Sequence, residues 1–274
     1  MCYDISFQVN MRQLSDYYPD LIYDEQVDMT FEPFDHVQGV RVFSEHPILY
    51  VNRDDFKVHC RRMQWGIIEY QYTDMPDMAA RNGWLNIRAE KILADPHSYW
   101  FKIKSRRCLI PVSGIYEHRG VKGWTKKVPY WIQPKGQEVT FLPGLYSRAK
   151  IVDKNTGEVQ DIWTFAVITR AANELMKHIH NTGDNANRMP LLLPLGMSME
   201  FLSEDLTLKR YAEILDYEMP SEALDYHPVY TVRTSKLRPD NQCKSDYYEW
   251  AKLPPLGEAG PEASAQREIG TIFK

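Results

Sequence analysis

The second residue of the chain is a cysteine, and this position gives it a chemistry that an internal cysteine lacks. A small second residue permits removal of the initiator methionine, which would make Cys2 the first residue. An α-amine with a pKa of about 7.7–8.0 would then stand beside a thiol with a pKa of about 8.5, and both nucleophiles are partly available at neutral pH. An aldehyde would form a Schiff base with the amine, and the thiol would close a long-lived thiazolidine ring. Taken alone, Cys2 is more typical of a small buried residue at the start of a strand.

Three further segments contain residues suited to acid–base chemistry and anion binding. They read WLNIRAE at residues 84–90, RRCLIPVSGIYE at 106–117, and TFAVITRAANELMKHIH followed by NRMPLLL within 163–193. An asparagine amide both donates and accepts hydrogen bonds, and Glu and His are common general acids and bases. Each segment alone also has an ordinary explanation, such as a helix cap at Asn86 or a strand-end charge at Glu117.

Taken together and in this order, these segments make the chain resemble the SRAP family, named for SOS response-associated peptidase, which processes abasic sites. That family begins with Met-Cys and carries an N-x-R-x-E motif after a W-G-hydrophobic stretch, here Trp65-Gly66. It also has an R-R-C segment that ends in Glu, and a block in which T, A-N, H and R-M-P follow one another. The resemblance covers about residues 1–240.

The resemblance implies a chemical role for each matching residue. Cys2 is the nucleophile, and Asn86 holds its amine and thiol. Glu117 is the general acid and base, with a pKa raised by partial burial, and it is also needed for self-removal of Met1. His180 shuttles protons while the sugar ring opens and the Schiff base forms. The implied function is an abasic-site sensor that crosslinks itself to DNA, an enzyme with lyase-like and autopeptidase-like activity.

The same resemblance implies three contacts with the partner, single-stranded DNA that carries an abasic site. Arg88 and Arg188 each bind a phosphate, because a guanidinium fork matches two phosphate oxygens. Trp65 lies near the DNA-binding surface, where an aromatic ring can stack on a base.

The chain departs from the family pattern at two places. Asp4 stands where family members commonly have arginine, which removes one expected cation from beside the nucleophile. An insertion at residues 181–187 (NTGDNAN) lengthens the usual spacing from His to R-M-P. Its Gly- and Asn-rich composition predicts a flexible loop that bulges out without moving its ends.

Two other classes of function stay open. Cys2 with Glu117 and His180 could form a cysteine peptidase that acts on other proteins, since Cys–His pairs activate thiols. No oxyanion-hole signature accompanies them, and an N-terminal amine beside the thiol suits carbonyl capture better. The other alternative is a noncatalytic reader of single-stranded or modified DNA. Mutation of Cys2 separates these classes, because the enzymes lose all activity and a reader keeps its affinity.

The charges are segregated along the chain, although the net charge is only −4. Residues 1–50 contain nine acidic and two basic residues, whereas residues 100–150 contain eleven basic and two acidic residues. The basic segment could supply a phosphate-binding face. Lysines on solvated strand edges are the ordinary explanation.

The composition is typical of a soluble globular protein, with 43% hydrophobic and 26% charged residues. No run approaches the roughly 18 apolar residues of a membrane span, and the N-terminus lacks the pattern of a secretory signal. The four cysteines stand far apart without a C-x-x-C pair, which suits a reducing cytosol and gives no metal-site signal. We expect a cytoplasmic protein, nucleoid-associated when bound to DNA, that needs no metal or cofactor.

Short β-rich runs between turn signals predict most of the secondary structure. They lie at residues 39–43, 48–51, 108–112, 130–133, 139–142, 163–169 and 189–193. Helical patterns occur at 171–178 and at 198–215, the latter as one or two helices, while 86–95 begins extended and continues as a short helix.

This pattern predicts an α+β fold with a mostly antiparallel, twisted or barrel-like β core and peripheral helices. One catalytic domain would span residues 1–253. Residues 254–274, rich in Pro, Gly, Ala and Glu, would form a disordered tail.

Overall fold

The computed structural model describes residues 2–24, 34–234, 236 and 238–258 of the chain. Its centre is a closed barrel of five strands in the order β11-β10-β7-β4-β5, closed because β5 pairs in parallel with β11. The barrel strands are β4 (Glu45–Val51), β5 (Val58–Trp65), β7 (Arg107–Val112), β10 (Thr140–Val152) and β11 (Val159–Ala171). Three short strands attach to it, namely β2 (Ile22–Tyr23), β6 (Asn86–Arg88) and β12 (Arg188–Pro190).

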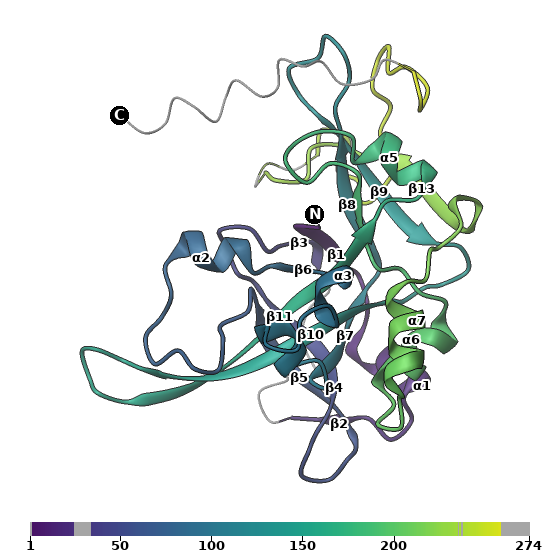
Figure 1. Ribbon diagram of the computed structural model, residues 1–274. Helices are drawn as coiled ribbons and strands as arrows, with labels where there is room; N and C mark the ends of the chain where they lie inside the picture. The colour runs from purple at the N-terminus through teal and green to yellow at the C-terminus, as the bar shows by residue number, and fades with distance from the viewer. Residues whose placement is uncertain (1, 25–33, 235, 237, 259–274) are drawn as a thin grey trace.

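A second sheet has the strand order β13-β9-β8-β1-β3, with antiparallel pairing throughout. Its members are β1 (Asp4–Phe7), β3 (Phe34–Gln38), β8 (Gly114–Arg119), β9 (Val128–Pro134) and β13 (Leu224–Pro228). Figure 1 shows β8, β9 and β13 above the barrel, with β1 at the junction of the two sheets. β8 follows β7 after the single residue Ser113, whose backbone N–H donates to the carbonyl oxygen of Ser6 at 2.8 Å. The chain therefore passes from the barrel into the second sheet beside β1.

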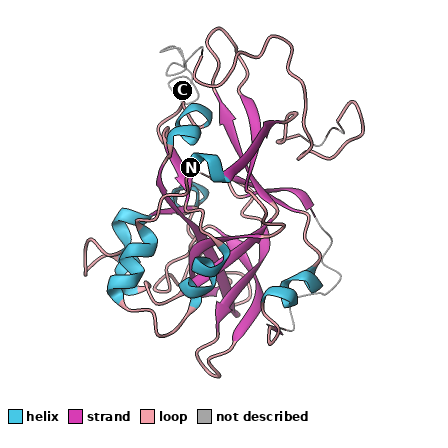
Figure 2. Cartoon of the chain, turned by 90° about the vertical axis from the view of Figure 1, so that its right-hand side faces the viewer, coloured by secondary structure: helices cyan, strands magenta, loops and turns pink. Residues whose placement is uncertain are grey.

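The helices are short and lie outside the strands (Figure 2). They are α1 (Leu14–Tyr17), α2 (Met78–Gly83), α3 (Ala89–Ile92), α4 (Tyr99–Lys102), α5 (Glu174–Ile179), α6 (Leu195–Leu202) and α7 (Leu208–Leu215), with 3₁₀ turns η1 (Met11–Gln13) and η2 (Ser221–Ala223). Within the described ranges, none has the length and apolarity that a membrane crossing requires. The predicted α+β class with a barrel-like, mostly antiparallel core and peripheral helices is confirmed.

The core is continuous between the barrel and the second sheet. Five of the six residues of β7 are buried, because one face lines the barrel and α6 packs nearby on the other. β10 lies between β7 and β11, and at position 144 its backbone is so close to neighbouring atoms that only glycine fits. A Cβ atom there would lie 2.7 Å from the carbonyl oxygen of Ala166 and 2.6 Å from Cδ1 of Ile110.

Most of the predicted elements are present, and the errors have local causes. Residues 86–95 form β6 and then α3, as predicted, and residues 198–215 belong to two helices, α6 and α7. Residues 39–43 are a turn instead of a strand, because Arg41 and Phe43 adopt positive φ angles of 64° and 52°. The predicted helix at 171–178 begins only at Glu174, since Ala171 pairs with β12 and Asn173 caps the helix.

The beginning of the predicted tail is part of the folded domain. Arg119 of β8 is buried and donates to the carbonyl oxygens of Pro254 at 2.7 Å, Pro255 at 2.6 Å and Glu258 at 2.9 Å. The expected boundary at residue 253 is therefore too early. Residues 259–274 of the predicted tail lie outside the described residues.

Candidate active site

Cys2 is buried directly before β1, and the pairing of β1 determines what lies beside it. Asp4 pairs with Tyr116 and Ser6 pairs with Gly114 across the antiparallel β1–β8 ladder. In this register, the residues just before Asp4 run alongside the end of β8 that carries Glu117. The sheet thus brings the N-terminal cysteine to a buried carboxyl group.

Asn86 holds Cys2 from the barrel side. β6 pairs in parallel with β11 and aligns Asn86 with Val167. The Asn86 side chain donates from Nδ2 to the carbonyl oxygen of Cys2 at 2.9 Å. Its Oδ1 atom is buried and has no hydrogen-bond partner among the described residues. Since buried polar atoms nearly always have partners, this oxygen is available to a ligand or to a rearranged N-terminus.

Glu117 and His180 form a buried pair next to Cys2. Oε2 of Glu117 lies 3.9 Å from Nε2 of His180, which is longer than a hydrogen bond. Nδ1 of His180 lies 2.7 Å from the carbonyl oxygen of Arg188. A carbonyl only accepts, so the neutral imidazole carries its proton on Nδ1 and turns the lone pair of Nε2 towards Glu117.

Burial determines the charge of both groups. It raises the pKa of Glu117 to about 8, and the nearby Asp4 carboxylate contributes to the rise. It lowers the pKa of His180 to about 4. At neutral pH the pair therefore consists of a protonated acid and a neutral base, which can pass a proton without a buried net charge. Oε1 of Glu117 is a second buried oxygen without a partner in the part of the chain that the structure describes.

The insertion at residues 181–187 fixes His180 in place. The backbone N–H of Asn187 donates to the carbonyl oxygen of His180 at 2.8 Å, which closes the loop at its base. The side chain of Asn181 bonds both the N–H and the C=O of Gly120, at 2.8 and 3.0 Å. The two ends of this loop therefore lie close together, and its first residue connects the end of α5 to the end of β8.

Asp4, which stands where arginine was expected, pairs with a cation from the C-terminal part of the chain, Arg233. The Asp4 carboxylate, 1% exposed, accepts hydrogen bonds from Arg233 at 2.6, 2.9 and 3.0 Å and lies 2.8 Å from Nε2 of His36. Burial alone raises the pKa of Asp4, but these hydrogen bonds outweigh it and lower the pKa. Sequence reasoning missed Arg233 because 229 positions separate the two residues; the only signal was that a buried aspartate requires a partner.

The Cys2 thiol is not activated as a thiolate. Burial raises its pKa well above the usual value, and the charges of Glu117 and Asp4 raise it further. The contact of Sγ with the carbonyl oxygen of Asp4 is long, at 3.8 Å.

The predicted DNA ligands differ in exposure. Arg88, at the end of β6, is exposed. Arg188 is 12% exposed and is held by Glu90, at 2.6 and 3.1 Å, and by the carbonyl oxygen of Thr169 at 2.8 Å. Arg188 can therefore bind a phosphate only if its ion pair with Glu90 is broken.

Trp65 does not lie at a surface, so the expectation that it stacks on a base is wrong. It is fully buried, donates from Nε1 to the carbonyl oxygen of Leu85 at 2.9 Å, and stacks on Phe165 at 5.8 Å between ring centroids. The reason is its place at the end of β5, where its side chain faces the apolar core.

Three arginines of the basic segment at 100–150 are bound within the protein itself. Arg119 binds the C-terminal carbonyls described above, and Arg107 donates to the carbonyl oxygens of Phe201 and Ser203 at 2.7 and 2.6 Å. Arg148 forms an ion pair with Asp161 at 2.7 Å. Lys127 is the member whose charge acts on Glu117 and His180.

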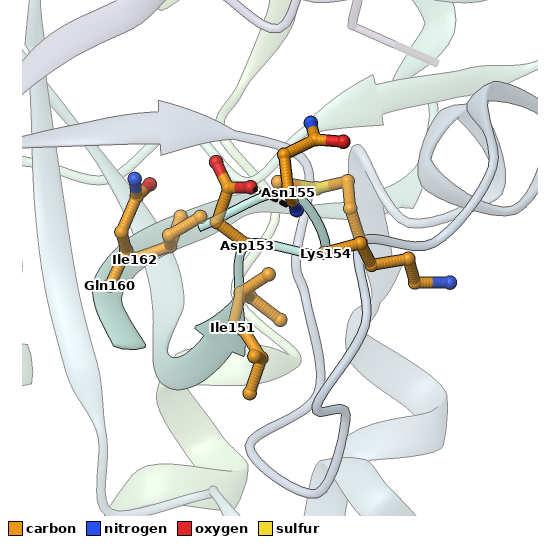
Figure 3. Close-up of a pocket in the computed structure, with 8 residues that line it drawn as sticks. Ile151, Asp153, Lys154, Asn155, Gln160 and Ile162 are labelled. Carbon is orange, nitrogen blue, oxygen red and sulfur yellow. Dashed lines mark hydrogen bonds between the residues drawn. The ribbon is translucent and has the colours of Figure 1, made fainter. Parts of the chain in front are cut away.

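A hollow of about 380 Å³ lies apart from these residues, at the β10–β11 hairpin (Figure 3). Its Asp153 carboxylate accepts the backbone N–H groups of Asn155 at 2.8 Å and Thr156 at 3.2 Å, so it stabilises the hairpin turn. None of the candidate site residues lines this hollow. Among the described residues, no three His, Cys, Asp or Glu side chains gather as a metal site would require.

The fold is a closed five-stranded β-barrel with an attached antiparallel sheet, and the buried second residue, Cys2, lies beside the Asn86 amide and near the buried Glu117–His180 pair. The chain belongs to the SRAP family. The family model described as SOS response associated peptidase (SRAP) matches residues 1–234.

Several known proteins are similar to this chain. Abasic site processing protein YoaM of Bacillus subtilis (strain 168) is 25% identical over 214 residues, which cover 77% of this chain and 86% of that protein. Abasic site processing protein YoqW of the same organism is 26% identical over 214 residues, covering 77% and 88%. The crystal structure of a protein from Bacteroides thetaiotaomicron has a TM-score of 0.66 at 26% identity, covering 89% of this chain and 97% of that one. A protein from Bordetella bronchiseptica shares the fold, with a TM-score of 0.61 at 18% identity, covering 84% and 100%.

Proposed function

We propose that this protein processes abasic sites in DNA by capturing them covalently, in single-stranded DNA, through the N-terminus of Cys2. Two observations support the proposal together. The relatives that match most of the chain are named abasic site processing proteins. The chain also belongs to the family whose motifs suggested the roles of Cys2, Asn86 and Glu117. The observation that carries it is the convergence of Asn86 and Glu117 on a buried Cys2.

The reaction begins at the ring-opened aldehyde of the abasic deoxyribose. The α-amine of Cys2 attacks the aldehyde carbon, the carbonyl oxygen leaves as water, and an imine forms. The thiol sulfur then bonds to the same carbon while its proton moves to the imine nitrogen. The product is a thiazolidine, and one water molecule is released overall without any change of oxidation state.

The buried pair supplies the protons for these steps. Protonated Glu117 donates to the ring oxygen as the ring opens and regains a proton from the C1 hydroxyl group, which becomes the aldehyde. It then donates this proton to the departing hydroxyl group when the imine forms. Neutral His180 accepts a proton on Nε2 when the amine gives one up. A group with a pKa near the working pH suits this exchange, and the pKa of Glu117 is about 8.

The state of the thiol favours aldehyde capture over the peptidase alternative. A cysteine peptidase requires a thiolate, whose pKa is lowered by an adjacent imidazolium. Here burial raises the pKa of the Cys2 thiol, and burial lowers the pKa of His180 to about 4. Ring closure on an imine needs no preformed thiolate, because the imine nitrogen accepts the thiol proton.

The proposal requires that Met1 be absent from the active protein, since the α-amine of Cys2 must be free. Met1 lies outside the described residues. A mass measurement of the purified protein gives its presence directly, and fully active protein that retains Met1 would refute the mechanism. The proposed substrate also implies action in the cytoplasm, at the nucleoid, as part of the DNA-damage response.

The central test compares Cys2→Ala with Cys2→Ser on an abasic oligonucleotide. Alanine keeps an α-amine, so an imine forms, but it hydrolyses and is visible only after borohydride reduction. Serine closes an oxygen ring that reopens more easily. We expect a durable adduct from the wild type and much less from both variants. Cys243→Ala, which removes an exposed free thiol, is the matched control. An equally durable adduct from Cys2→Ala would mean that another amine performs the capture.

A further inference from the structure

Arg233 is held by Asp4 in a way that leaves part of its guanidinium group open. Nε and Nη2 both donate to the Asp4 carboxylate, at distances from 2.6 to 3.0 Å. Nη1 has no hydrogen-bond partner among the described residues. The Arg233 side chain is 40% exposed, whereas that of Asp4 is 1% exposed. The pair therefore extends from the protein interior, where the carboxylate lies, to the surface, where part of the guanidinium group is exposed.

The position of Arg233 relative to the reaction centre is also defined. Asp4 is two residues from Cys2, and its backbone pairs with Tyr116 next to Glu117. The charge of Arg233 acts on both Glu117 and Tyr3. An anion bound at Nη1 would thus lie on the surface near the segment that holds Cys2.

A second cation faces the same carboxyl group. Lys127 is an exposed residue whose charge acts on Glu117, as that of Arg233 does. Its Nζ would lie 3.9 Å from a Cβ atom at Gly183, within the loop that follows His180. Two cations from separate segments therefore flank the buried acid of the site.

We propose that Arg233, held by Asp4, binds a phosphate group of the DNA strand next to the captured sugar. Lys127 provides a second positive charge at the same surface. This inference rests on the proposed function and assigns the binding of the strand to residues that no family motif in the sequence includes.

The chemistry of the pair favours a phosphate over other anions or a purely structural role. A guanidinium offers several N–H donors in one plane, which suits the tetrahedral oxygens of a phosphate. The contacts with Asp4 already restrict the side chain, so binding costs little further rotamer entropy.

The test uses an oligonucleotide that contains tetrahydrofuran in place of the abasic sugar, which has no aldehyde and binds without reacting. A neutral methylphosphonate replaces, one at a time, the phosphates on either side of this position. If Arg233 binds one of them, that replacement lowers the affinity of the wild type about tenfold, as the loss of one hydrogen bond to a charged group predicts. This arm needs no protein variant, so it does not depend on how a variant folds.

The second arm measures Arg233→Gln and Arg233→Lys on the same oligonucleotides. We expect Arg233→Gln to lose about the same affinity on the normal strand and to lose no more on the methylphosphonate strand. Its affinity should also depend less on salt, by about 0.7 in the logarithmic slope. Lys154→Gln, the same charge change on the β10–β11 hairpin, is the matched control.

The outcomes separate this inference from the proposed function. Equal losses of the wild type and Arg233→Gln on the methylphosphonate strand would overturn the role of Arg233, even if the wild type crosslinks to abasic DNA. A phosphate-specific loss that vanishes in Arg233→Gln would support it. That result would stand even if no crosslink forms, in which case the capture mechanism alone fails.

Discussion

The buried carboxyl group of Glu117 lies 3.9 Å from Nε2 of His180, and burial keeps both groups uncharged at neutral pH. Strand β8 brings the acid and the end of α5 brings the base. The pair makes the site sensitive to pH in a direction that can be derived.

The stability of the protein should fall with rising pH because of Glu117. Its pKa rises from 4.5 in the unfolded chain to about 8 in the folded protein, so the folded state binds more protons between these values. The stabilisation is therefore complete below pH 4.5 and is lost as the pH approaches 8. We expect Glu117→Gln to be more stable than the wild type at pH 9 and to lose this advantage below about pH 5. Urea denaturation at several pH values measures the difference, and a difference independent of pH would contradict the assignment.

The rate of adduct formation should have a maximum near pH 8. The α-amine of Cys2 must lose a proton, with a pKa of about 7.7–8.0, whereas Glu117 must keep its proton and has a pKa of about 8. The acidic and alkaline limbs of the pH–rate profile report apparent pKa values of the coupled site. In protein from which Met1 has been removed by an aminopeptidase, Glu117→Gln should lower the rate by about 10²- to 10⁴-fold and abolish the alkaline limb. Single-turnover measurements from pH 6 to 10 test this, and an unchanged profile would exclude Glu117 as the acid.

Release of Arg188 from Glu90 should strengthen DNA binding if Arg188 is a phosphate ligand. Glu90→Gln removes the ion pair at 2.6 Å. Such a partly exposed pair is worth up to about 1 kcal/mol, so the affinity for single-stranded DNA should rise by about two- to fivefold. Glu213→Gln, which removes the same charge on α7, is the control. Equal effects of the two substitutions would mean that only the net charge matters.

Substitution of Trp65 should affect stability and leave DNA binding intact. Trp65→Phe removes the hydrogen bond to Leu85 and part of the packing on Phe165. We expect a loss of roughly 2–4 kcal/mol in the free energy of unfolding. The affinity of the folded protein for single-stranded DNA should not change. A loss of affinity without a loss of stability would restore the idea that this ring contacts a base.

Truncation should separate the docked part of the C-terminal segment from the remainder. A chain that ends at residue 253 removes the three carbonyl partners of buried Arg119 from Pro254, Pro255 and Glu258. Arg119 would keep its contact with the hydroxyl group of Tyr130 at 3.3 Å, and loss of hydrogen bonds to a charged group costs about 1.5–3 kcal/mol. A chain that ends at residue 260 keeps all three partners and should match the full-length protein in thermal denaturation. Arg119→Met in the shorter chain should recover part of the loss, and equal stability of both truncated chains would disprove the contact.

The sequence by itself indicated the type of fold, the family and the candidate residues of the site. Alternating apolar runs predicted a β-rich core, and the spacing of N-x-R-x-E and R-M-P marked Asn86, Arg88 and Arg188. These features are readable because periodicity and motifs are local along the chain. The contact of Asn86 with Cys2, and the nearness of Glu117 to Cys2, depend on strand register, which no local pattern contains.

The tertiary structure decided what depends on partners that are distant in sequence. The sequence suggested that Trp65 lies at the surface, but its side chain faces the apolar core. Arg119 and Arg107 of the basic segment donate instead to backbone carbonyl oxygens of the protein itself. In the sequence, Asp4 replaces an expected arginine and so removes a cation. The fold places Arg233, which is 229 positions away, against Asp4. Burial and ion pairing depend on which atoms surround a group in space, and only the packed chain determines those neighbours.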